Sequence, residues 1–442
     1  MKSDCSLIKK LSKYVIRSTL STVGNSIYVL ADSFFVAQSI GVLGVAVMNL
    51  AMPLFNIMDG LGLLLGMGGG TLFTIYKSHN LQKAQRIYSK ALILGIIIGL
   101  LFSLCGIFLS SQISYALGAN SDTFNHTHEY VHIILLFGPT FILNNLLLSF
   151  SRNDHGTKIA MIAMIMSSLA NIFLDWFLII KLNLGMKGAG LATSLAPIIS
   201  LLIITKHFMS PHNKLKIVKF KTQVKELIHI TSLGLPSFLT EMSTGVGIFI
   251  YNWVFLKING NNAVTAYGIA ANVLLVALSL FTGVAQGIQP IVSQAYANKN
   301  FKNIKFGLRF GLIVSEIIGL CCLVFVYFKS NMIIDFFNAA SNKTVITLTT
   351  EGMKMLLLSL IFSSLNVVFN IFFSAINKSH TSIFMVVIRG YLLPILIVLI
   401  MSRLGTNGVW LSLTIIEFIA FILELFAWSF IRKRLEQNDF TI

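Results

Sequence analysis

The chain has 442 residues, of which 55% are hydrophobic and only 11% are charged, and its mean hydropathy is +0.82. Soluble domains carry about 25% charged residues, so this composition excludes a soluble globular protein. Apolar stretches of about 20 residues recur along the whole chain, each long enough to cross a bilayer as an α-helix. No run of about ten residues alternates polar and apolar side chains, which excludes a transmembrane β-barrel.

These stretches predict an all-α polytopic membrane protein with twelve transmembrane helices. In chain order the predicted spans lie near residues 14–38, 47–76, 88–113, 130–151, 159–180, 189–207, 228–256, 263–296, 306–328, 350–374, 382–402 and 407–431. The formal net charge is +17, and with the N-terminus placed inside, 25 of the 33 lysines and arginines fall in inner segments and seven in outer ones. The positive-inside rule then predicts a multi-pass protein of the cell membrane with both termini cytoplasmic. The basic charge reflects orientation and contact with anionic membrane lipid, and no nucleic-acid partner is expected.

The two halves of the chain repeat each other at an offset of about 220 residues. The segment LGMKGAGL at 184–191 matches LGTNGVWL at 404–411 without a gap. Each half then holds six spans, and because six is even the halves are parallel repeats. The predicted organisation is an N-terminal lobe at 1–206, a polar cytoplasmic linker at 207–226 and a C-terminal lobe at 227–442.

Span one carries polar residues at steps of three and four, which places them on one face of a helix. These residues are Ser18, Ser21, Asn25, Tyr28 and Asp32. Lipid does not solvate such groups, so this face must look toward the bundle interior or toward a water-filled cavity.

Spans five and six add further polar groups. Asn171 and Asp175 lie about one helical turn apart in span five, and Thr193 follows the glycine-rich start of span six. Carboxylate, amide and hydroxyl oxygens suit a Na⁺ ion, and two nearby carboxylates in a low dielectric would otherwise share a proton. Three interpretations therefore remain for these residues: a Na⁺ site, a shared proton, or a polar network that serves only the structure. No other metal and no cofactor is predicted.

Asp59 and Glu241 are two further acids at membrane depth. Glu241 follows a proline that is expected to kink span seven, and its carboxylate is a candidate to face a substrate cleft. For Asp59 the residues leave two interpretations open, because the side chain could line the same cleft or cap a distorted helix.

The C-terminal half lacks acids at the positions that match those of the N-terminal half. The match to Asp32 falls within 248–255, and the match to Asp175 falls near Ile395. We therefore expect an ion site in the N-terminal lobe only. The remaining acids at membrane depth are expected to pair with Arg389 or with polar neighbours; they are Glu316, Glu417 and Glu424.

Several segments together resemble one family of transporters. They are LADSFFVAQSIG in span one, NIFLDWFLI and LGMKGAGLAT in spans five and six, AQGIQPIVSQAYANKN in span eight and LGTNGVWLSL in span twelve. In this order they resemble the multidrug and toxic compound extrusion (MATE) family, in particular its bacterial MepA/DinF-like branch. The resemblance covers nearly the whole chain and implies two six-helix lobes in a V-shaped arrangement.

The resemblance also implies roles for individual residues. A coupling-cation site would be formed by Asp32, Asn171, Asp175 and Thr193, with a neighbouring polar network of Asn25, Tyr28 and Asn145. Such transporters often carry a proline early in span one that is tied to bending of that helix. Here the stretch reads VIRSTLSTVGN and holds no proline, so a bending span one is not predicted.

The predicted function is secondary active multidrug efflux, in which Na⁺ or H⁺ enters while amphipathic, often cationic, drugs leave through a monomeric protein. The sequence has no Walker loop, no nucleophile motif and no His/Glu metal pair at helical spacing, so an enzyme is not predicted. The alternative is a lipid-linked precursor flippase of the same superfamily. A flippase would want an arginine-rich cavity for a pyrophosphate, and only Arg389 lies at membrane depth.

Overall fold

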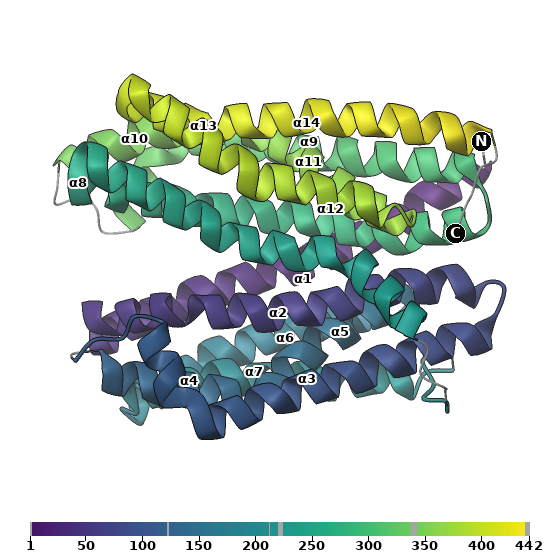
Figure 1. The fold of residues 1–442 in the computed structure, drawn as a ribbon, viewed down its shortest axis with the longest axis horizontal. Coiled ribbons are helices and arrows are strands. Elements are labelled where there is room, and N and C mark those ends of the chain that lie inside the picture. Colours follow the sequence, from purple (N-terminus) through teal and green to yellow (C-terminus); the bar gives the residue numbers. More distant parts are fainter. Residues whose placement is uncertain (1, 122, 212, 220–223, 337–342, 438–442) are drawn as a thin grey trace. The chain divides into compact units, whose positions relative to one another are not determined.

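The computed structural model describes residues 2–121, 123–211, 213–219, 224–336 and 343–437, and within these ranges every regular element is a helix. In chain order the elements are α1 (Lys2–Ile40), α2 (Val42–Lys77), α3 (Leu81–Ala116), α4 (Phe124–Leu136), α5 (Gly138–Asn153), α6 (Thr157–Asp175), η1 (Trp176–Lys181), α7 (Gly185–Phe208), α8 (Val224–Ala297), α9 (Phe301–Phe336), α10 (Lys343–Leu357), α11 (Leu360–Ala375), α12 (Ser379–Val387), η3 (Ile388–Leu392), α13 (Leu393–Met401), η4 (Ser402–Leu404) and α14 (Gly405–Glu436) (Figure 1).

The long apolar helices account for the predicted crossings. Within the described ranges, 9 helices are long and apolar enough to span a membrane, and two bent pairs, α4 with α5 and α10 with α11, raise this to 11. One of them, Ser379–Glu436, is too long for a single crossing and turns back at Gly405, whose φ is 76°, so that α13 packs against α14. The predicted class, an all-α polytopic membrane protein, is confirmed.

The helices group by their contacts into two compact units. The first, here called the N-unit, is Leu20–Met242, and the second, the C-unit, is Met1–Thr19 together with Ser243–Ile442. Both divisions fall inside helices, in α1 and in α8. α8 holds two of the predicted spans, which meet at Gly260, where φ is 66° and ψ is −157°. The lobes drawn from the sequence repeat, with limits at 206 and 227, stay a prediction.

Glycines bring the helices of the N-unit into close contact. α2 packs along α3 and α5. A Cβ on Gly62 would lie 2.8 Å from the carbonyl oxygen of Ile142 in α5. On the first part of α8, a Cβ on Gly234 would lie 1.8 Å from the carbonyl oxygen of Leu64. Small residues at these crossings allow backbones to approach where bulkier side chains would hold them apart.

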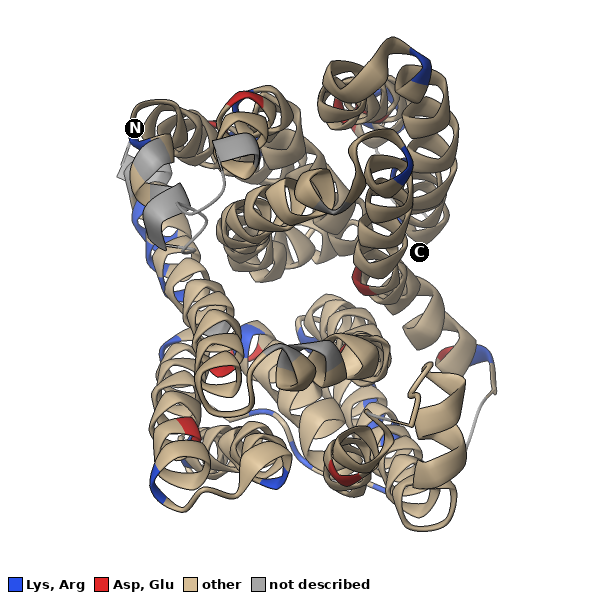
Figure 2. Ribbon diagram, turned by 90° about the vertical axis from the view of Figure 1, so that its left-hand side faces the viewer, with Lys and Arg blue, Asp and Glu red and all other residues tan. Residues whose placement is uncertain are grey.

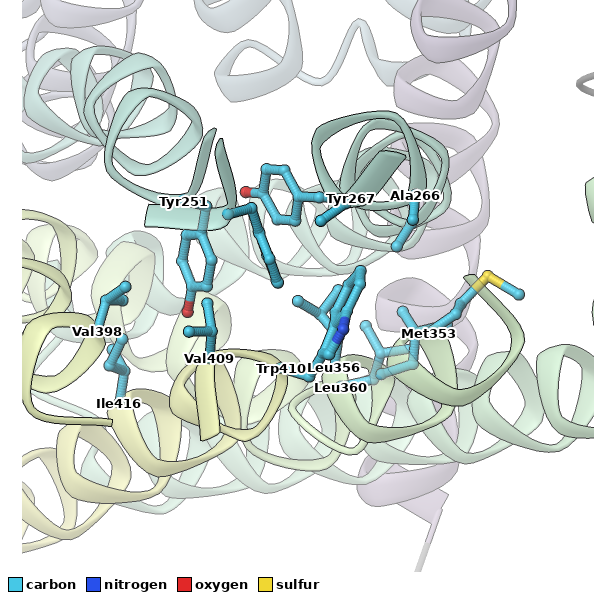
Figure 3. Packing of buried hydrophobic residues seen from close by; sticks show 14 of the residues in the cluster. Tyr251, Ala266, Tyr267, Met353, Leu356, Leu360, Val398, Val409, Trp410 and Ile416 are labelled. Atoms are coloured by element: carbon cyan, nitrogen blue, oxygen red, sulfur yellow. The ribbon is translucent and has the colours of Figure 1, made fainter. Parts of the chain in front are cut away.

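Aromatic side chains fill the core of the C-unit. The Trp410 ring is 1% exposed, and its centroid lies 4.6 Å from that of Phe255. The hydroxyl groups of Tyr251 and Ser412 are 2.7 Å apart, so the tyrosine keeps a hydrogen bond inside the apolar cluster. Figure 3 shows Tyr251 and Trp410 among the aliphatic side chains of this cluster. Gly352 leaves the room for the indole, since a Cβ there would lie 2.0 Å from Trp410.

The contact between α2 and α8 predicts the effect of one added methyl group. Gly234→Ala would place a methyl group inside the van der Waals radius of a backbone oxygen, and overpacking of this kind costs about 1–3 kcal/mol. We expect a lower melting temperature in detergent, followed by loss of the monodisperse peak on heating. Gly247→Ala in the same helix is the matched control, because nothing lies within 4 Å of the position that its methyl group would take. Equal melting temperatures for the two variants would contradict the close contact.

Candidate functional site

Three helices of the N-unit place polar side chains in one buried region. Asp32 comes from α1, Asn171 and Asp175 from α6, and Thr193 from α7, and their exposed fractions are 4%, 0%, 0% and 5%. The predicted polar face of span one is therefore turned inward at Asp32, as the cost of exposing a carboxylate to lipid requires.

The helix that carries Asp175 changes its winding immediately after this residue. α6 ends at Asp175, and a π-helical turn runs from Trp176 to Lys181. The amide of Leu182 donates to the carbonyl of Phe177, five residues back, at 2.9 Å. A π-turn widens the helix locally and often occurs at functional sites.

Close packing of α6 against α7 sets the position of Thr193. The Ser167 hydroxyl donates across this contact to the carbonyl of Ala196 at 2.7 Å. The Thr193 hydroxyl lies 2.9 Å from the carbonyl of Ala189, one turn earlier, and 3.3 Å from Oδ2 of Asp32. Its single proton can be directed to either acceptor, so Thr193 can turn its lone pairs toward a cation that approaches the carboxylate.

The remaining polar atoms of this group have no hydrogen-bond partner among the described residues. They are Oδ1 of Asp32, both carboxylate oxygens of Asp175 and both polar atoms of the Asn171 amide. Buried polar groups in proteins are nearly always hydrogen-bonded, so five such atoms in one region need a physical explanation. An ionised carboxylate without a partner is the costliest case.

Charge repulsion adds to the cost of burial. Asp32 and Asp175 lie close enough for their carboxylates to interact electrostatically. Repulsion and desolvation both oppose two negative charges here, and both are relieved when a proton or a cation binds. The geometry therefore supplies oxygen ligands and a negative field, which is the chemistry of a site for Na⁺ or H⁺.

Tyr130 of α4 belongs to this region although the sequence analysis assigns it no role. Its side chain is 1% exposed, neighbours Thr193 and is within electrostatic range of Asp32 and Asp175. Its partners lie on α1, α6 and α7, so the periodicity of its own span carries no signal for them. Tyr28 of α1 likewise lies within electrostatic range of both acids.

Asn145 joins a second acidic group instead. Its Nδ2 donates to Oδ1 of Asp59 at 2.8 Å, which joins α5 to α2. Glu241 lies within electrostatic range of Asp59, and its Cβ would be 3.6 Å from a Cβ on Gly60. Asp59 and Glu241, both half-buried, therefore lie near each other in the N-unit, and Asp59 is hydrogen-bonded to the Asn145 amide. The side chain of Asn25 lies outside the described part of the structure.

The C-unit pairs its buried charges more completely. Nε of Arg389 lies 2.8 and 3.1 Å from the two carboxylate oxygens of Glu417, and the Asn366 amide donates to the same carboxylate at 2.6 Å. The expected pairing with Arg389 is confirmed for Glu417. Glu316 accepts from the Ser364 hydroxyl at 2.7 Å. Glu424, 1% exposed, interacts electrostatically with Arg389, but its Oε2 has no hydrogen-bond partner among the described residues.

Within the described residues, no group of three or more His, Cys, Asp or Glu side chains has the arrangement of a metal site. A monovalent ion that uses amide and hydroxyl oxygens does not require such a group, because Asn171 and Thr193 would supply two of its ligands.

Comparison with known proteins places this geometry in context. The MatE family model matches residues 18–177 and 236–400. The multidrug export protein MepA of Staphylococcus saprophyticus is 26% identical over 440 residues, which cover 97% of this chain and 95% of the relative. MepA of Staphylococcus aureus is 24% identical, with 97% and 95% covered.

Solved structures share the fold. One described as the outward-facing conformation of a multidrug resistance MATE family transporter of the MOP superfamily has a TM-score of 0.92, with 21% identity and coverage of 98% and 97%. A MOP superfamily transporter from Pyrococcus furiosus, reported to have a binding pocket of reverse polarity, has a TM-score of 0.90 at 20% identity, with 97% of both chains covered.

The Arg389–Glu417 ion pair of the C-unit is expected to contribute to folding stability. Arg389→Gln would leave the Glu417 carboxylate buried without its cation, a change that costs about 3–5 kcal/mol. We expect a clear fall in melting temperature in detergent. The double variant with Glu417→Gln should recover most of the loss, since neither charge then remains. A single variant as stable as the wild type would show that this pair does not hold α14 in place.

Proposed function

Because the chain belongs to the MatE family of transporters, we propose that it exports amphipathic, often cationic, drugs in exchange for Na⁺ or H⁺ entering the cell. It is a transporter and not an enzyme. The observation that carries the coupling half of this proposal is the group of unpartnered polar atoms on Asp32, Asn171 and Asp175. The multidrug export function named for the staphylococcal relatives supports the choice of cargo.

In this proposal Asp32 and Asp175 bind the coupling ion. For Na⁺, the two carboxylates, the Asn171 amide oxygen and the Thr193 hydroxyl provide the ligands. For H⁺, the two carboxylates share the proton, and the same neighbours solvate it. The support is burial: a site at 0–5% exposure binds positive charge strongly because water does not compete.

Ion binding would alter the N-unit through the helices that carry the ligands. Without positive charge the carboxylates of α1 and α6 repel each other, and with it they attract a common ion. The π-turn directly after Asp175 is the place in this span where the winding already departs from the α-helix, and we propose that α6 adjusts there. Ion occupancy thus biases the N-unit between two arrangements, which is the condition for coupling ion flow to drug movement.

Asp59 and Glu241 are proposed to face the drug. Two acids with a net negative charge attract the cationic part of an amphipathic compound, and Phe238, which lies against Gly60 beside them, offers an aromatic face. The flippase alternative is weaker. It requires free cationic side chains at membrane depth, whereas Arg389 is paired with Glu417.

We further propose that the protein lies in the cell membrane with both termini cytoplasmic. In a cysteine-free background, single cysteines at Asn80 and Asn213 should react with a membrane-impermeant maleimide only after the cells are opened. A cysteine at Lys187, in a predicted outer turn, should react in intact cells and serves as the control. The reason is the excess of basic residues in the inner segments. Labelling of residue 213 in intact cells would refute the orientation.

The coupling role predicts distinct effects for two kinds of acid. Asp32→Asn and Asp175→Asn keep the side-chain shape but remove the charge that binds an ion. Both proteins should fold, bind a fluorescent cationic drug without a gradient, and show only background uptake in proteoliposomes with an imposed Na⁺ or H⁺ gradient. Asp59→Asn is the contrasting variant: it should weaken drug binding while transport of the bound fraction still responds to the gradient.

These outcomes separate the two proposed sites. If Asp175→Asn loses drug binding and its residual transport still follows the ion gradient, Asp175 contacts drug and the coupling assignment is wrong. Gradient-driven uptake at the wild-type rate by Asp32→Asn would remove Asp32 from the ion site.

A further inference from the structure

The segment after α7, residues 213–219, is hydrogen-bonded to other parts of the N-unit. The backbone N–H of Lys214 donates to Oδ2 of Asp154 at 2.7 Å, and Nε2 of Gln85 donates to the carbonyl of Lys214 at 3.2 Å. Further along, the backbone N–H of Val218 donates to the Ser89 hydroxyl at 3.0 Å. Residues 213–219 thus lie against the first turns of α3. Because backbone groups make these attachments, the lysine side chains of the segment remain available.

Asp154 is the centre of this attachment. It lies in the turn between α5 and α6, is fully buried, accepts from His207 Nε2 at 3.2 Å and pairs with Lys77. Burial by itself raises the pKa of Asp154, but the hydrogen bonds from His207, Lys77 and the Lys214 N–H lower it below its ordinary value. The carboxylate is therefore charged at neutral pH and joins the ends of α2 and α7 to the segment.

The attached segment exposes a mixture of basic and apolar side chains. Leu215 is buried, whereas Met209 and Ile217 are 85% and 70% exposed. Among the described residues of this segment and of the last turn of α7, every exposed charged side chain is positive; these are Lys206, Lys214, Lys216 and Lys219. The sequence from 206 to 219 contains no acid, and the whole chain has 33 basic and 16 acidic residues. Figure 2 marks lysine and arginine in blue and aspartate and glutamate in red along the ribbon.

The position of Ser89 sets the depth of this surface. One turn further along α3, Ile93 is 41% exposed, and it begins a row of exposed apolar side chains that continues with Ile96, Ile97 and Leu100. Four residues of helix rise about 6 Å. Val218, bonded to Ser89, therefore lies about one helical turn from the start of the lipid-facing surface, which is the level of lipid headgroups.

We propose that residues 206–211 and 213–219 form a binding element for anionic phospholipid. The four lysines contact headgroup phosphates, and the exposed Met209 and Ile217 side chains enter the adjoining apolar layer. Basic side chains next to a membrane attract anionic lipid, and each contributes roughly a fivefold gain in affinity. Apolar side chains at the same level favour a lipid over a soluble polyanion, which would leave them in water.

Lipid titration of the purified full-length protein, read by native mass spectrometry, tests the proposal. The probes are phosphatidylglycerol and phosphatidylcholine of equal chain length. We expect the wild type to prefer phosphatidylglycerol. Replacing the four lysines by Gln should weaken its binding by about tenfold or more and leave phosphatidylcholine unchanged. For a control matched in charge, replacement of Lys299, Lys302 and Lys305, in the turn before and the start of α9, by Gln is compared with the same replacement of Lys214, Lys216 and Lys219. The α9 variant should change the affinity much less.

Two variants that keep all four lysines test the attachment and the apolar contact. Ser89→Ala removes the acceptor of the Val218 N–H, and Ile217→Ser removes an exposed apolar group. Each should weaken phosphatidylglycerol binding several-fold without changing the net charge. Asp154 is left in place because its removal would leave Lys77 and His207 unpaired.

Three results would overturn the proposal. One is equal loss in the lysine variant and in its control, which would indicate general attraction to basic residues. Another is equal binding of both lipids by the wild type. The third is displacement of phosphatidylglycerol by soluble glycerol phosphate or by heparin at similar concentration, which would assign the surface to a soluble anion. None of these readouts requires drug transport, so they stand apart from the coupling experiments.

Discussion

The structure depends on one constraint: in the hydrocarbon of a membrane, a polar group must find its partner within the protein. Most buried polar side chains here meet it. Thr74 donates to Asn153, the Ser315 hydroxyl reaches the Ser364 carbonyl, and Glu417 receives both Arg389 and Asn366. Other buried polar atoms without a partner occur among the described residues, but Asp32, Asn171 and Asp175 bring five of them, four of which are oxygens, into one region. That concentration, with two carboxylates in it, is the reason for assigning the proposed ion site to these residues.

Much of the fold could be predicted because a single helix in lipid follows simple rules. Length and hydropathy determine the spans, and a period of 3.6 residues determines the face. Asp32, Asn171 and Asp175 are expected to turn inward for that reason, and all three are buried. The fold class follows from the same patterns, whereas the family is indicated by the resemblance of particular sequence segments. Where two predicted spans run together into one long helical stretch, glycines with positive φ at 260 and 405 mark the turn between them.

Relations between helices could not be predicted from periodicity. The family resemblance places Asn145 beside the ion site, but its amide bonds Asp59, because glycines on α2 bring α5 against that part of the helix. Tyr130 escapes prediction for the same reason: its partners lie on α1, α6 and α7. The repeat in the sequence divides the chain at 206–227, whereas the contacts divide it within α1 and α8. The sequence repeat divides the chain by similarity of its two halves. The contact-based division instead depends on which parts of the long helices α1 and α8 pack against which neighbours.

The two halves show how one backbone plan carries different chemistry. In each half the fifth span contains a π-helical turn, after Asp175 in one and around Arg389 in the other. The first turn adjoins two carboxylates that have no counter-charge among the described residues, and the second supplies a cation that already neutralises Glu417. In the C-unit, Glu424 is also buried and one of its carboxylate oxygens has no hydrogen-bond partner among the described residues, but Arg389 interacts with it electrostatically. The proposed coupling site in the N-unit fits this asymmetry, because no cation among the described residues pairs with Asp32 or Asp175 there.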